Sequence, residues 1–296
     1  MMPDSSQPGD STVPSTSIPR ASLIQTQLFR PPATTIGNGA DALHYTPRSP
    51  AWHCAFSRNG EFLAACFGSP DPCVRIWKLT EDKQWVLQAT LEGVHERTIR
   101  SIAFAPLASP TVLAAGSFDG TVSIWEYNEK TSNQWECTTQ LEGHDNEVKC
   151  VVWNSTGSLL ATCGRDKTVW LWESFLSGSV GGGDGGDFEC IAVLNGHEGD
   201  VKCVAFAASH GQWGDGDEIL LSGSYDDTIK IWAEDAGDWY CAMSIPDVQA
   251  DTIWSLAVSP GSGRLVSGSA DGSMAIFKSY TEKEKKELFP EEGSGR

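Results

Sequence analysis

One short phrase recurs five times along the chain and constrains its fold more than any other feature. Each copy is a mostly apolar segment that ends on a tryptophan or, in the last copy, on a phenylalanine. The terminal residues follow one another at intervals of 48, 47, 60 and 45 residues. They are Trp77, Trp125, Trp172, Trp232 and Phe277, and the copies read CVRIW, GTVSIW, KTVWLW, DTIKIW and GSMAIF. A period of this length indicates an architecture in which one supersecondary unit is copied along the chain.

The copy at residues 141–173 shows what each unit builds. Apolar runs at 148–153, 159–163 and 168–172 are separated by turn residues, and a fourth run at 188–194 precedes the next Gly-His pair. Four short strands per unit, an upstream Gly-His and a terminal Trp are typical of WD-type repeats, in which four antiparallel strands form one blade. We therefore predict an all-β fold, a WD-repeat β-propeller of four-stranded antiparallel blades with five repeats visible.

A set of polar residues accompanies the repeats. The third and fourth repeats contain His144, Thr162, Asp166 and Trp172, and His197, Ser222, Asp226 and Trp232. We predict that each set is a buried tetrad, because buried polar groups need hydrogen-bond partners. The second repeat has Ala115 at the hydroxyl position and is expected to lack that link; the fifth has Gln249 at the histidine position. His-Ser-Asp also suggests a catalytic triad, but one set per blade favours a structural role, so we predict no catalytic residues and no enzyme activity.

The repeats occupy residues 51–280, between two segments of different composition. Residues 1–50 are rich in Ser, Thr and Pro, and we expect a mostly disordered head in which 22–29 could form a strand that closes the ring. Residues 281–296 are a charged tail. The Gly-rich insert at 178–187 lacks the Lys-Ser/Thr of a phosphate-binding loop and is interpreted as a linker. Five repeats either close a five-bladed ring or belong to an incomplete version of a larger propeller.

The chain is strongly acidic, with 21 Lys and Arg against 39 Asp and Glu and a net charge of −18. This balance argues against direct binding to nucleic acid, which depends on basic residues that neutralise phosphates. It also disfavours anionic membrane surfaces. The sequence contains no apolar run long enough to cross a membrane and no secretory signal pattern near its start. We therefore expect a cytoplasmic protein, with the nucleus as a second compartment.

Nine cysteines are present without a CxxC pair. Cys150 and Cys203 occupy the same place in successive repeats, and so do Cys137, Cys190 and Cys241. Because equal places lie in different blades, we expect these thiols to lie well apart in the core and to be reduced. Metal and iron–sulfur sites need several cysteines at one point, so we predict no metal and no cofactor. If the chain binds a metal through cysteines, the less regular Cys54, Cys66 and Cys73 are the strongest candidate ligands.

Three columns of the repeat are predicted to lie on one face, at the end of the blades that carries the Asp turn. The residue before the turn Asp gives Phe118, Arg165, Tyr225 and Ala270; the position after the first inner-strand residue gives Arg100, Lys149, Lys202 and Trp254; two residues earlier stand Thr98, Glu147, Asp200 and Thr252. Three basic residues in a row predict a positive patch, and Arg and aromatic residues dominate interface hot spots. We predict that this face binds an acidic protein segment; simple solvation of the strand ends is the alternative. The partner-binding residues would be Arg165, Lys149, Lys202, Arg100, Tyr225, Trp254 and Phe118.

Four blocks go beyond the general repeat pattern. They are Glu-Val-Lys at 147–149, Arg-Asp-Lys at 165–167, Ser-Tyr-Asp-Asp at 224–227 and Thr-Ile-Trp-Ser at 252–255. With these blocks, residues 50–280 resemble the WD-repeat family of the cytosolic iron–sulfur protein assembly (CIA) targeting complex, in register through five repeats. The resemblance implies a seven-bladed propeller without catalytic activity or a cluster of its own. Two of that family's blades have no counterpart in this sequence.

The resemblance also implies partners and a function. The partners would be a helical-repeat scaffold, a small targeting subunit, a hydrogenase-like iron–sulfur protein and the apo-proteins that receive [4Fe–4S] clusters. A functionally important Arg of the family matches Arg165. We therefore predict a non-catalytic adaptor in delivery of iron–sulfur clusters to cytosolic and nuclear apo-proteins. The alternatives are another WD-repeat adaptor, of a chromatin or ubiquitin-ligase complex, and a metal-carrying protein or enzyme that uses the cysteines.

Overall fold

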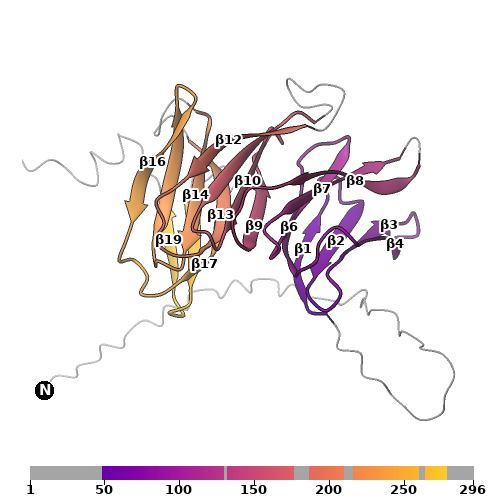
Figure 1. The fold of residues 1–296 in the computed structure, drawn as a ribbon, viewed down its shortest axis with the longest axis horizontal. Helices are drawn as coiled ribbons and strands as arrows, with labels where there is room; N and C mark the ends of the chain where they lie inside the picture. Colours follow the sequence, from indigo (N-terminus) through magenta and orange to yellow (C-terminus); the bar gives the residue numbers. More distant parts are fainter. Residues whose placement is uncertain (1–48, 130–131, 177–186, 210–215, 260–263, 279–296) are drawn as a thin grey trace, which may run out of the picture. The chain divides into compact units, whose positions relative to one another are not determined.

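The computed structural model describes residues 49–129, 132–176, 187–209, 216–259 and 264–278. Over these residues the chain forms nineteen strands and no helix. The strands are arranged as five antiparallel sheets that follow one another in chain order (Figure 1). The expected strand at 22–29, the tail at 281–296 and nearly all of the insert at 178–187 lie outside the described residues.

Within every sheet, strands that are neighbours in space are also neighbours along the chain. The first sheet contains β1 (Ala51–Phe56), β2 (Phe62–Phe67), β3 (Val74–Leu79) and β4 (Trp85–Leu91). The second contains β5 (Ile99–Phe104), β6 (Thr111–Ser117), β7 (Val122–Asn128) and β8 (Gln134–Leu141). The third contains β9 (Val148–Trp153), β10 (Leu159–Gly164), β11 (Val169–Ser174) and β12 (Phe188–Leu194). The fourth contains β13 (Val201–Ala208), β14 (Glu218–Ser224), β15 (Ile229–Asp235) and β16 (Asp238–Ile245), and the fifth contains β17 (Ile253–Ser259), β18 (Arg264–Ser269) and β19 (Met274–Lys278).

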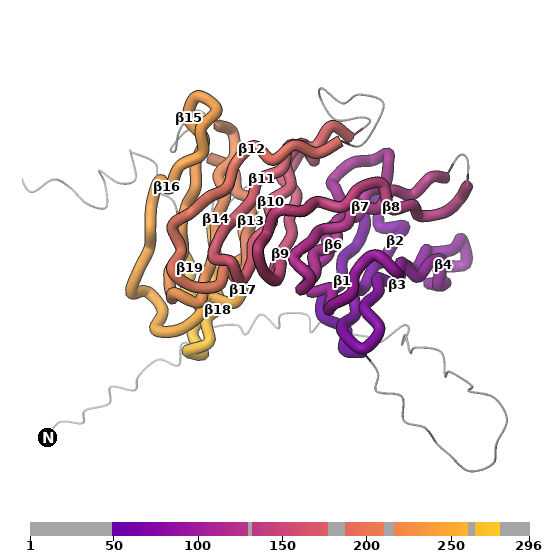
Figure 2. The backbone as a smooth tube through the Cα atoms, in the orientation of Figure 1, coloured from indigo at the N-terminus to yellow at the C-terminus, as the bar shows by residue number. Residues whose placement is uncertain are grey.

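This architecture confirms the predicted fold class, an all-β chain of antiparallel blades of the β-propeller type. Four sheets have four strands, and the fifth has three described strands. The tube in Figure 2 shows the same up-and-down course repeated from one sheet to the next.

The turn between the second and third strands follows the chemistry that its sequence predicts. In the third sheet the Asp166 carboxylate accepts hydrogen bonds from the Thr168 amide (3.1 Å) and hydroxyl (2.8 Å). Lys167, between them, has a φ of 70°. The equivalent Gly120 and Gly272 also have positive φ, of 93° and 83°. An Asp that bonds the backbone two residues on, followed by a left-handed residue, is an Asx-type turn, and it fixes where each third strand begins.

The apolar core lies between consecutive sheets. Cys163 and Leu171 of the third sheet, for example, belong to one buried cluster with Val201 and Val204 of the fourth. Equivalent clusters join the first sheet to the second, the second to the third and the fourth to the fifth. Each interior sheet is therefore covered on both faces, and the sheets stabilise one another as a stack.

The fifth sheet has an uncovered face in the described part of the chain. Met274 and Ile276 of β19 are 79% and 72% exposed, whereas the equivalent Val169 and Leu171 of β11 are fully buried. The register is the same, so the difference comes from the neighbour: the fourth sheet covers β11, and no described sheet follows β19.

This contrast predicts unequal costs for matched truncations. We expect Leu171→Ala to lower the free energy of unfolding by about 2–5 kcal/mol, because it opens a cavity between two sheets. Ile276→Ala should change it by less than about 1 kcal/mol, because an exposed side chain leaves no cavity. Urea unfolding of the two variants measures both values, and similar losses would show that the outward face of the fifth sheet is covered in solution.

Candidate partner-binding face at the first strands

A buried histidine links the loop before the third sheet to the sheet itself. His144 Nδ1 lies 2.7 Å from Asp166 Oδ2, and its Nε2 lies 2.8 Å from Thr162 Oγ1. Trp172 Nε1 donates to the same Thr162 hydroxyl at 3.1 Å. These four residues form one continuous hydrogen-bonded chain from the loop to the third strand of the sheet.

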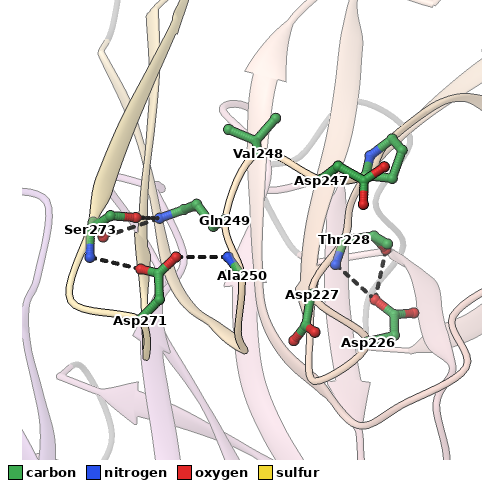
Figure 3. Close-up of a pocket in the computed structure, with 10 residues that line it drawn as sticks. Asp226, Asp227, Thr228, Asp247, Val248, Gln249, Ala250, Asp271 and Ser273 are labelled. Atoms are coloured by element: carbon green, nitrogen blue, oxygen red, sulfur yellow. Dashed lines mark hydrogen bonds between the residues drawn. The ribbon is translucent and has the colours of Figure 1, made fainter.

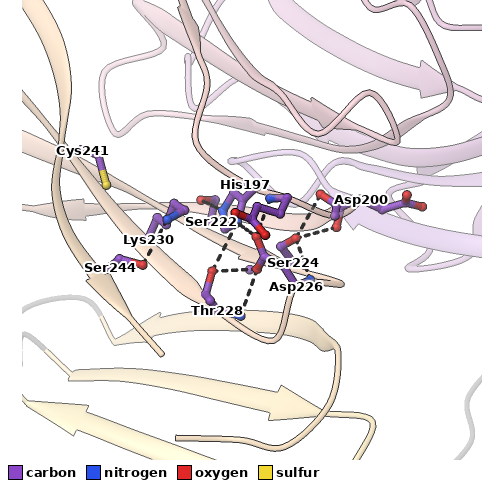
Figure 4. Close-up of polar contacts among 12 residues, drawn as sticks. His197, Asp200, Ser222, Ser224, Asp226, Thr228, Lys230, Cys241 and Ser244 are labelled. Carbon is purple, nitrogen blue, oxygen red and sulfur yellow. Dashed lines mark hydrogen bonds and ion pairs between the residues drawn. The ribbon is translucent and has the colours of Figure 1, made fainter. Parts of the chain in front are cut away.

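The fourth sheet has the same arrangement (Figure 4). His197 lies 2.8 Å from Asp226 and 2.7 Å from the Ser222 hydroxyl, to which Trp232 donates at 2.8 Å. Ser222 is fully buried. A hydroxyl in that position cannot reach a substrate, so this His-Ser-Asp set is placed to hold the blade together and not to act as a nucleophile.

The second sheet also has a complete link, and the prediction that it would lack one is wrong. Ser123 supplies the hydroxyl: His95 Nε2 lies 2.8 Å from Ser123 Oγ, and Trp125 Nε1 donates to it at 2.8 Å. Ser123 of β7 lies directly opposite Ala115 of β6. The hydroxyl has therefore moved across the strand pair, which a comparison of equal positions along the repeat does not detect.

This transposition can be tested by moving the hydroxyl back. We expect Ser123→Ala to destabilise the chain by about 1–3 kcal/mol, because the His95 ring and the Trp125 indole N–H lose a buried partner. The double variant Ala115→Ser/Ser123→Ala should recover most of this loss, since its hydroxyl then occupies the place of Ser222. Urea unfolding measures the three proteins, and a double variant no more stable than the single one would contradict the account.

In the fifth sheet a glutamine replaces the histidine. Gln249 Nε2 donates to the Ser273 hydroxyl and carbonyl oxygens, both at 3.1 Å, and Gln249 accepts a hydrogen bond from Ser267. The Asp271 carboxylate accepts from the Ala250 amide at 2.7 Å. A neutral amide thus takes over the bridging role of the imidazole.

Burial and hydrogen bonding shift the pKa values of the fourth-sheet tetrad. Burial raises the pKa of Asp226, but hydrogen bonds from the Thr228 side chain and the Glu198 amide, with the nearby His197, outweigh it and hold the pKa at about 2. Burial lowers the pKa of His197 below its usual 6.5, and Asp226 offsets this only in part. Both groups therefore bind protons more weakly in the folded chain than in the unfolded chain. Stability falls as the pH drops below 6.5 through His197, and below about 4 through Asp226.

Because Gln249 occupies the histidine position of the fifth sheet, His197→Gln is a suitable variant with which to test this pH dependence. Between about pH 7.5 and pH 5, where histidine titrates, we expect the free energy of unfolding of the wild type to decrease. His197→Gln should be less stable than wild type at neutral pH and should show a shallower decrease, because the titrating group is gone. Urea unfolding across this range measures the two slopes, and identical slopes would contradict the assignment to His197.

The pairing of the first and second strands skips one residue at the same place in every sheet. In the second sheet Ile99 pairs with Ser117 and Ser101 with Gly116, which leaves Arg100 unpaired. The skipped residues of the five sheets are Trp52, Arg100, Lys149, Lys202 and Trp254. Such bulges redirect a side chain and are frequent beside functional sites. We call these five residues, with their neighbours Arg97, Phe118, Glu147, Arg165, Asp200 and Tyr225, the bulge face.

Lys149 and Lys202 are not the free cations that the sequence predicted. Lys149 Nζ lies 2.6 Å from Glu147 Oε2, and Lys202 Nζ lies 2.9 Å from Asp200 Oδ2. The two lysine side chains are only 15% and 12% exposed. The acids come from the third predicted column, two residues before each lysine, so the row is neutralised locally and is not a simple positive patch.

An excess of positive charge lies around Glu147 instead, because three cations share this one carboxylate. Arg97 Nη2 lies 2.6 Å from Glu147 Oε1, and Arg165 Nη1 lies 3.8 Å from Oε2, which Lys149 also contacts. Burial raises the pKa of Glu147, but hydrogen bonds from Lys149 and Arg97 outweigh it and lower the pKa. Arg97 also donates to the Phe118 carbonyl, and the Phe118 ring lies 4.2 Å from Lys149 Nζ. Three cations surround one carboxylate, and the two arginine side chains are 54% and 55% exposed.

Sequence reasoning missed Arg97. Its counterparts in the later repeats are Asn146, Gly199 and Asp251, so no column of like residues marks the position. Only the contact with Glu147, fifty residues away, reveals its place.

Aromatic rings hold the remaining cations of the bulge face. Lys202 Nζ lies 5.4 Å from the centre of the Tyr225 ring and 5.2 Å from that of Trp254. The Arg100 guanidinium lies 5.2 Å from the Trp52 ring. Cation–π contacts of this kind fix both groups, while Tyr225, Trp254 and Trp52 keep about half of their surface exposed. The face thus offers exposed arginines around Glu147 and exposed aromatic rings on the first, fourth and fifth sheets.

A cleft of about 720 Å³ lies between the fourth and fifth sheets (Figure 3). Its lining includes four aspartates, Asp226, Asp227, Asp247 and Asp271. Two of them are engaged in turns: Asp226 accepts from the Thr228 amide at 3.0 Å and Asp271 from the Ser273 amide at 2.7 Å. Over the described residues, no three His, Cys, Asp or Glu side chains are placed to hold a metal ion.

The cysteines are not uniformly part of the core, which corrects the prediction. Cys66, Cys73, Cys163 and Cys203 are buried, Cys150 is partly buried, and Cys54, Cys137, Cys190 and Cys241 are exposed. Three of the exposed ones lie on fourth strands, at the outer edge of each sheet, where no further strand covers them. Cys150 also has a neighbour that the repeat did not predict, because Cys163 lies opposite it on β10.

Serial antiparallel blades joined by His-Asp-hydroxyl-Trp links define a WD-repeat propeller protein. In agreement, the family model described as "WD domain, G-beta repeat" matches residues 43–78, 85–126, 135–173, 188–233 and 241–278. No helix in the described segments is long and apolar enough to span a membrane.

Similarity to individual known proteins identifies a family within this class. The chain is 34% identical over 285 residues to "Probable cytosolic iron-sulfur protein assembly protein 1" of Botryotinia fuckeliana, an alignment that covers 77% of this chain and 62% of the relative. Proteins of the same name from Candida glabrata and Candida dubliniensis are 37% and 38% identical, over 71% and 73% of this chain and 74% and 80% of their own. The chain therefore belongs to the WD-repeat family of these assembly proteins, although it spans less than two thirds of the first relative.

Proposed function

We propose that this chain is a non-catalytic adaptor of cytosolic iron–sulfur protein assembly and that its bulge face binds the partner proteins. The names of the relatives support the process and the cytosolic compartment. The WD40 architecture supports an adaptor, since propellers of this kind present strand ends and loops around a rigid scaffold. The chain would also work in the nucleus, where it would serve nuclear apo-proteins.

The observation that carries the proposal is the group of exposed arginines around Glu147. A carboxylate held by three cations fixes the arginine side chains before a partner arrives, which reduces the entropy lost on binding. The nearby Phe118 ring adds apolar surface of the type found at hot spots. An acidic segment of a partner would pair with Arg97 and Arg165 and lie against the Phe118 ring.

The proposed partners are a helical-repeat scaffold, a small targeting subunit, a hydrogenase-like iron–sulfur protein and apo-proteins that await [4Fe–4S] clusters. A WD-repeat adaptor of chromatin or ubiquitin ligation was the alternative. It is not favoured, because the relatives described above share the name of iron–sulfur assembly.

The decisive variant reverses the exposed charge without disturbing the buried lysines. We expect Arg97→Glu/Arg165→Glu to weaken capture of the scaffold and client proteins by at least about tenfold, which corresponds to about 1.4 kcal/mol. Quantitative mass spectrometry of affinity pull-downs from the native cytosol measures this. Lys149 and Lys202 are left intact, because reversing a largely buried, paired charge would unfold the blade.

Arg264→Glu is the matched control. Arg264 is exposed and begins β18, at the end of the sheet opposite the bulge face. A single reversal there should leave capture unchanged. Capture that is equal for the wild type and the folded double variant would refute the binding face. Capture by the wild type of chromatin or ligase subunits alone would refute the assembly role.

A further inference from the structure

One register position distinguishes the third sheet from the others. In each sheet, the residue that directly follows the bulge on the first strand pairs with a residue of the second strand. The facing pairs in chain order are His53 and Cys66, Ser101 and Gly116, Cys150 and Cys163, Cys203 and Gly223, and Ser255 and Gly268. Of these five described pairs, only the third places two thiols opposite each other.

The geometry of this pair suits a disulfide. Directly opposed residues of antiparallel strands have Cα atoms about 4.5–5.5 Å apart, and disulfides join Cα atoms about 4.4–6.8 Å apart. Cys150 and Cys163 also point to the same side of the sheet, because both contact the apolar cluster between the third and fourth sheets. The register of the two strands therefore places the pair within the span that a disulfide bridges.

The surroundings give the two thiols different reactivity. A hydrogen bond from Cys163 outweighs burial and lowers the pKa of Cys150 to about 7. Burial raises the pKa of Cys163, whose Sγ lies 3.4 Å from the Val201 carbonyl oxygen. Burial also raises the pKa values of Cys66, to about 12, and of Cys203. Among these four inner thiols, Cys150 is the one whose pKa is lowered, which favours the thiolate, the form that attacks oxidants.

We propose that Cys150 and Cys163 are a peroxide-sensitive thiol pair that closes to a disulfide between β9 and β10. The Cys150 thiolate attacks one oxygen of hydrogen peroxide, the O–O bond breaks, and the hydroxide that leaves takes up a proton as water. The Cys163 sulfur then attacks the resulting sulfenic acid, loses its proton and displaces a second water. Two thiols are oxidised by two electrons in total, and one peroxide is reduced to two waters.

The two cysteines are close along the chain to two residues of the bulge face. Cys150 follows Lys149, and Cys163 precedes Arg165 by two residues. A disulfide here would covalently join β9, which carries Lys149, to β10, which ends directly before Arg165. The existence of the disulfide does not depend on the proposed function, and it can be tested without a partner protein.

The sequence makes the test direct, because trypsin releases Cys150 and Cys163 in one peptide, residues 150–165. The reduced full-length chain is treated with hydrogen peroxide at neutral pH, its free thiols are then blocked with N-ethylmaleimide, and the tryptic digest is analysed without reductant. We expect peptide 150–165 to lose two hydrogens and to carry no maleimide, and dithiothreitol to reverse both changes. A peptide that remains doubly alkylated would overturn the proposal.

The repeats supply matched variants. Cys163→Gly introduces the residue of the second, fourth and fifth sheets, and Cys150→Ser that of the second and fifth. Cys163→Ser removes the resolving thiol but keeps a hydrogen-bond donor beside Cys150, so dimedone should label Cys150 in this variant at least about tenfold more than the buried Cys203. Cys163→Gly removes that donor as well and should reduce the labelling of Cys150. Cys150→Ser should show no dimedone label on the 150–165 peptide. Equal labelling of Cys150 and Cys203, or a disulfide that forms only in urea, would refute a reactive pair in the folded chain.

Discussion

The packing of the first strand of one sheet against the second strand of the sheet before it is the constraint on which the rest of the structure depends, and it is tightest at two junctions. A Cβ atom on Gly116 would lie 2.8 Å from a methyl carbon of Val148 and equally close to one of Val151, and a Cβ on Gly223 would lie 2.6 Å from Ile253. Carbon atoms do not approach so closely, so glycine is required at these two positions, where the first strands of the third and fifth sheets lie against the preceding sheets. At the bulge one side chain of each of these strands leaves the regular pairing of the sheet.

The functional surface follows from this constraint. An acidic chain places Arg100, Lys149 and Lys202 at the bulges, where burial would be costly without partners. Carboxylates two residues earlier pair with Lys149 and Lys202, and aromatic rings contact all three cations, so most of the charge is used within the molecule. Arg97 and Arg165 share one carboxylate with Lys149 and therefore retain positive charge toward solvent. A surface can thus be positive locally although the chain carries a net charge of −18.

Sequence periodicity predicted the sheets, the Asp turns and the row of Arg100, Lys149, Lys202 and Trp254, because each of these depends on one position that recurs from blade to blade. It did not predict that these residues lie at bulges or that Trp52 belongs to the same row. It failed where two positions cooperate across strands or sheets. The hydroxyl on Ser123 in place of Ala115, the ion pair of Arg97 with Glu147, and the facing thiols of Cys150 and Cys163 are all of this kind. These three features are determined by the pairing register of the strands and by side-chain contacts between blades. Neither can be seen in a column of equivalent residues. Exposure of the fourth-strand cysteines was missed for a related reason, since the repeat does not reveal which strand forms the edge.

Hydrogen–deuterium exchange of the chain with and without its captured partner tests the central claim most directly. If the bulge face is the binding surface, amide protection should increase at residues 97–101, 146–150 and 164–167 and remain unchanged at the turns 58–61 and 154–158, at the other end of the sheets. Protection confined to those distal turns or to the outer fourth strands, with no change at the bulges, would contradict the account.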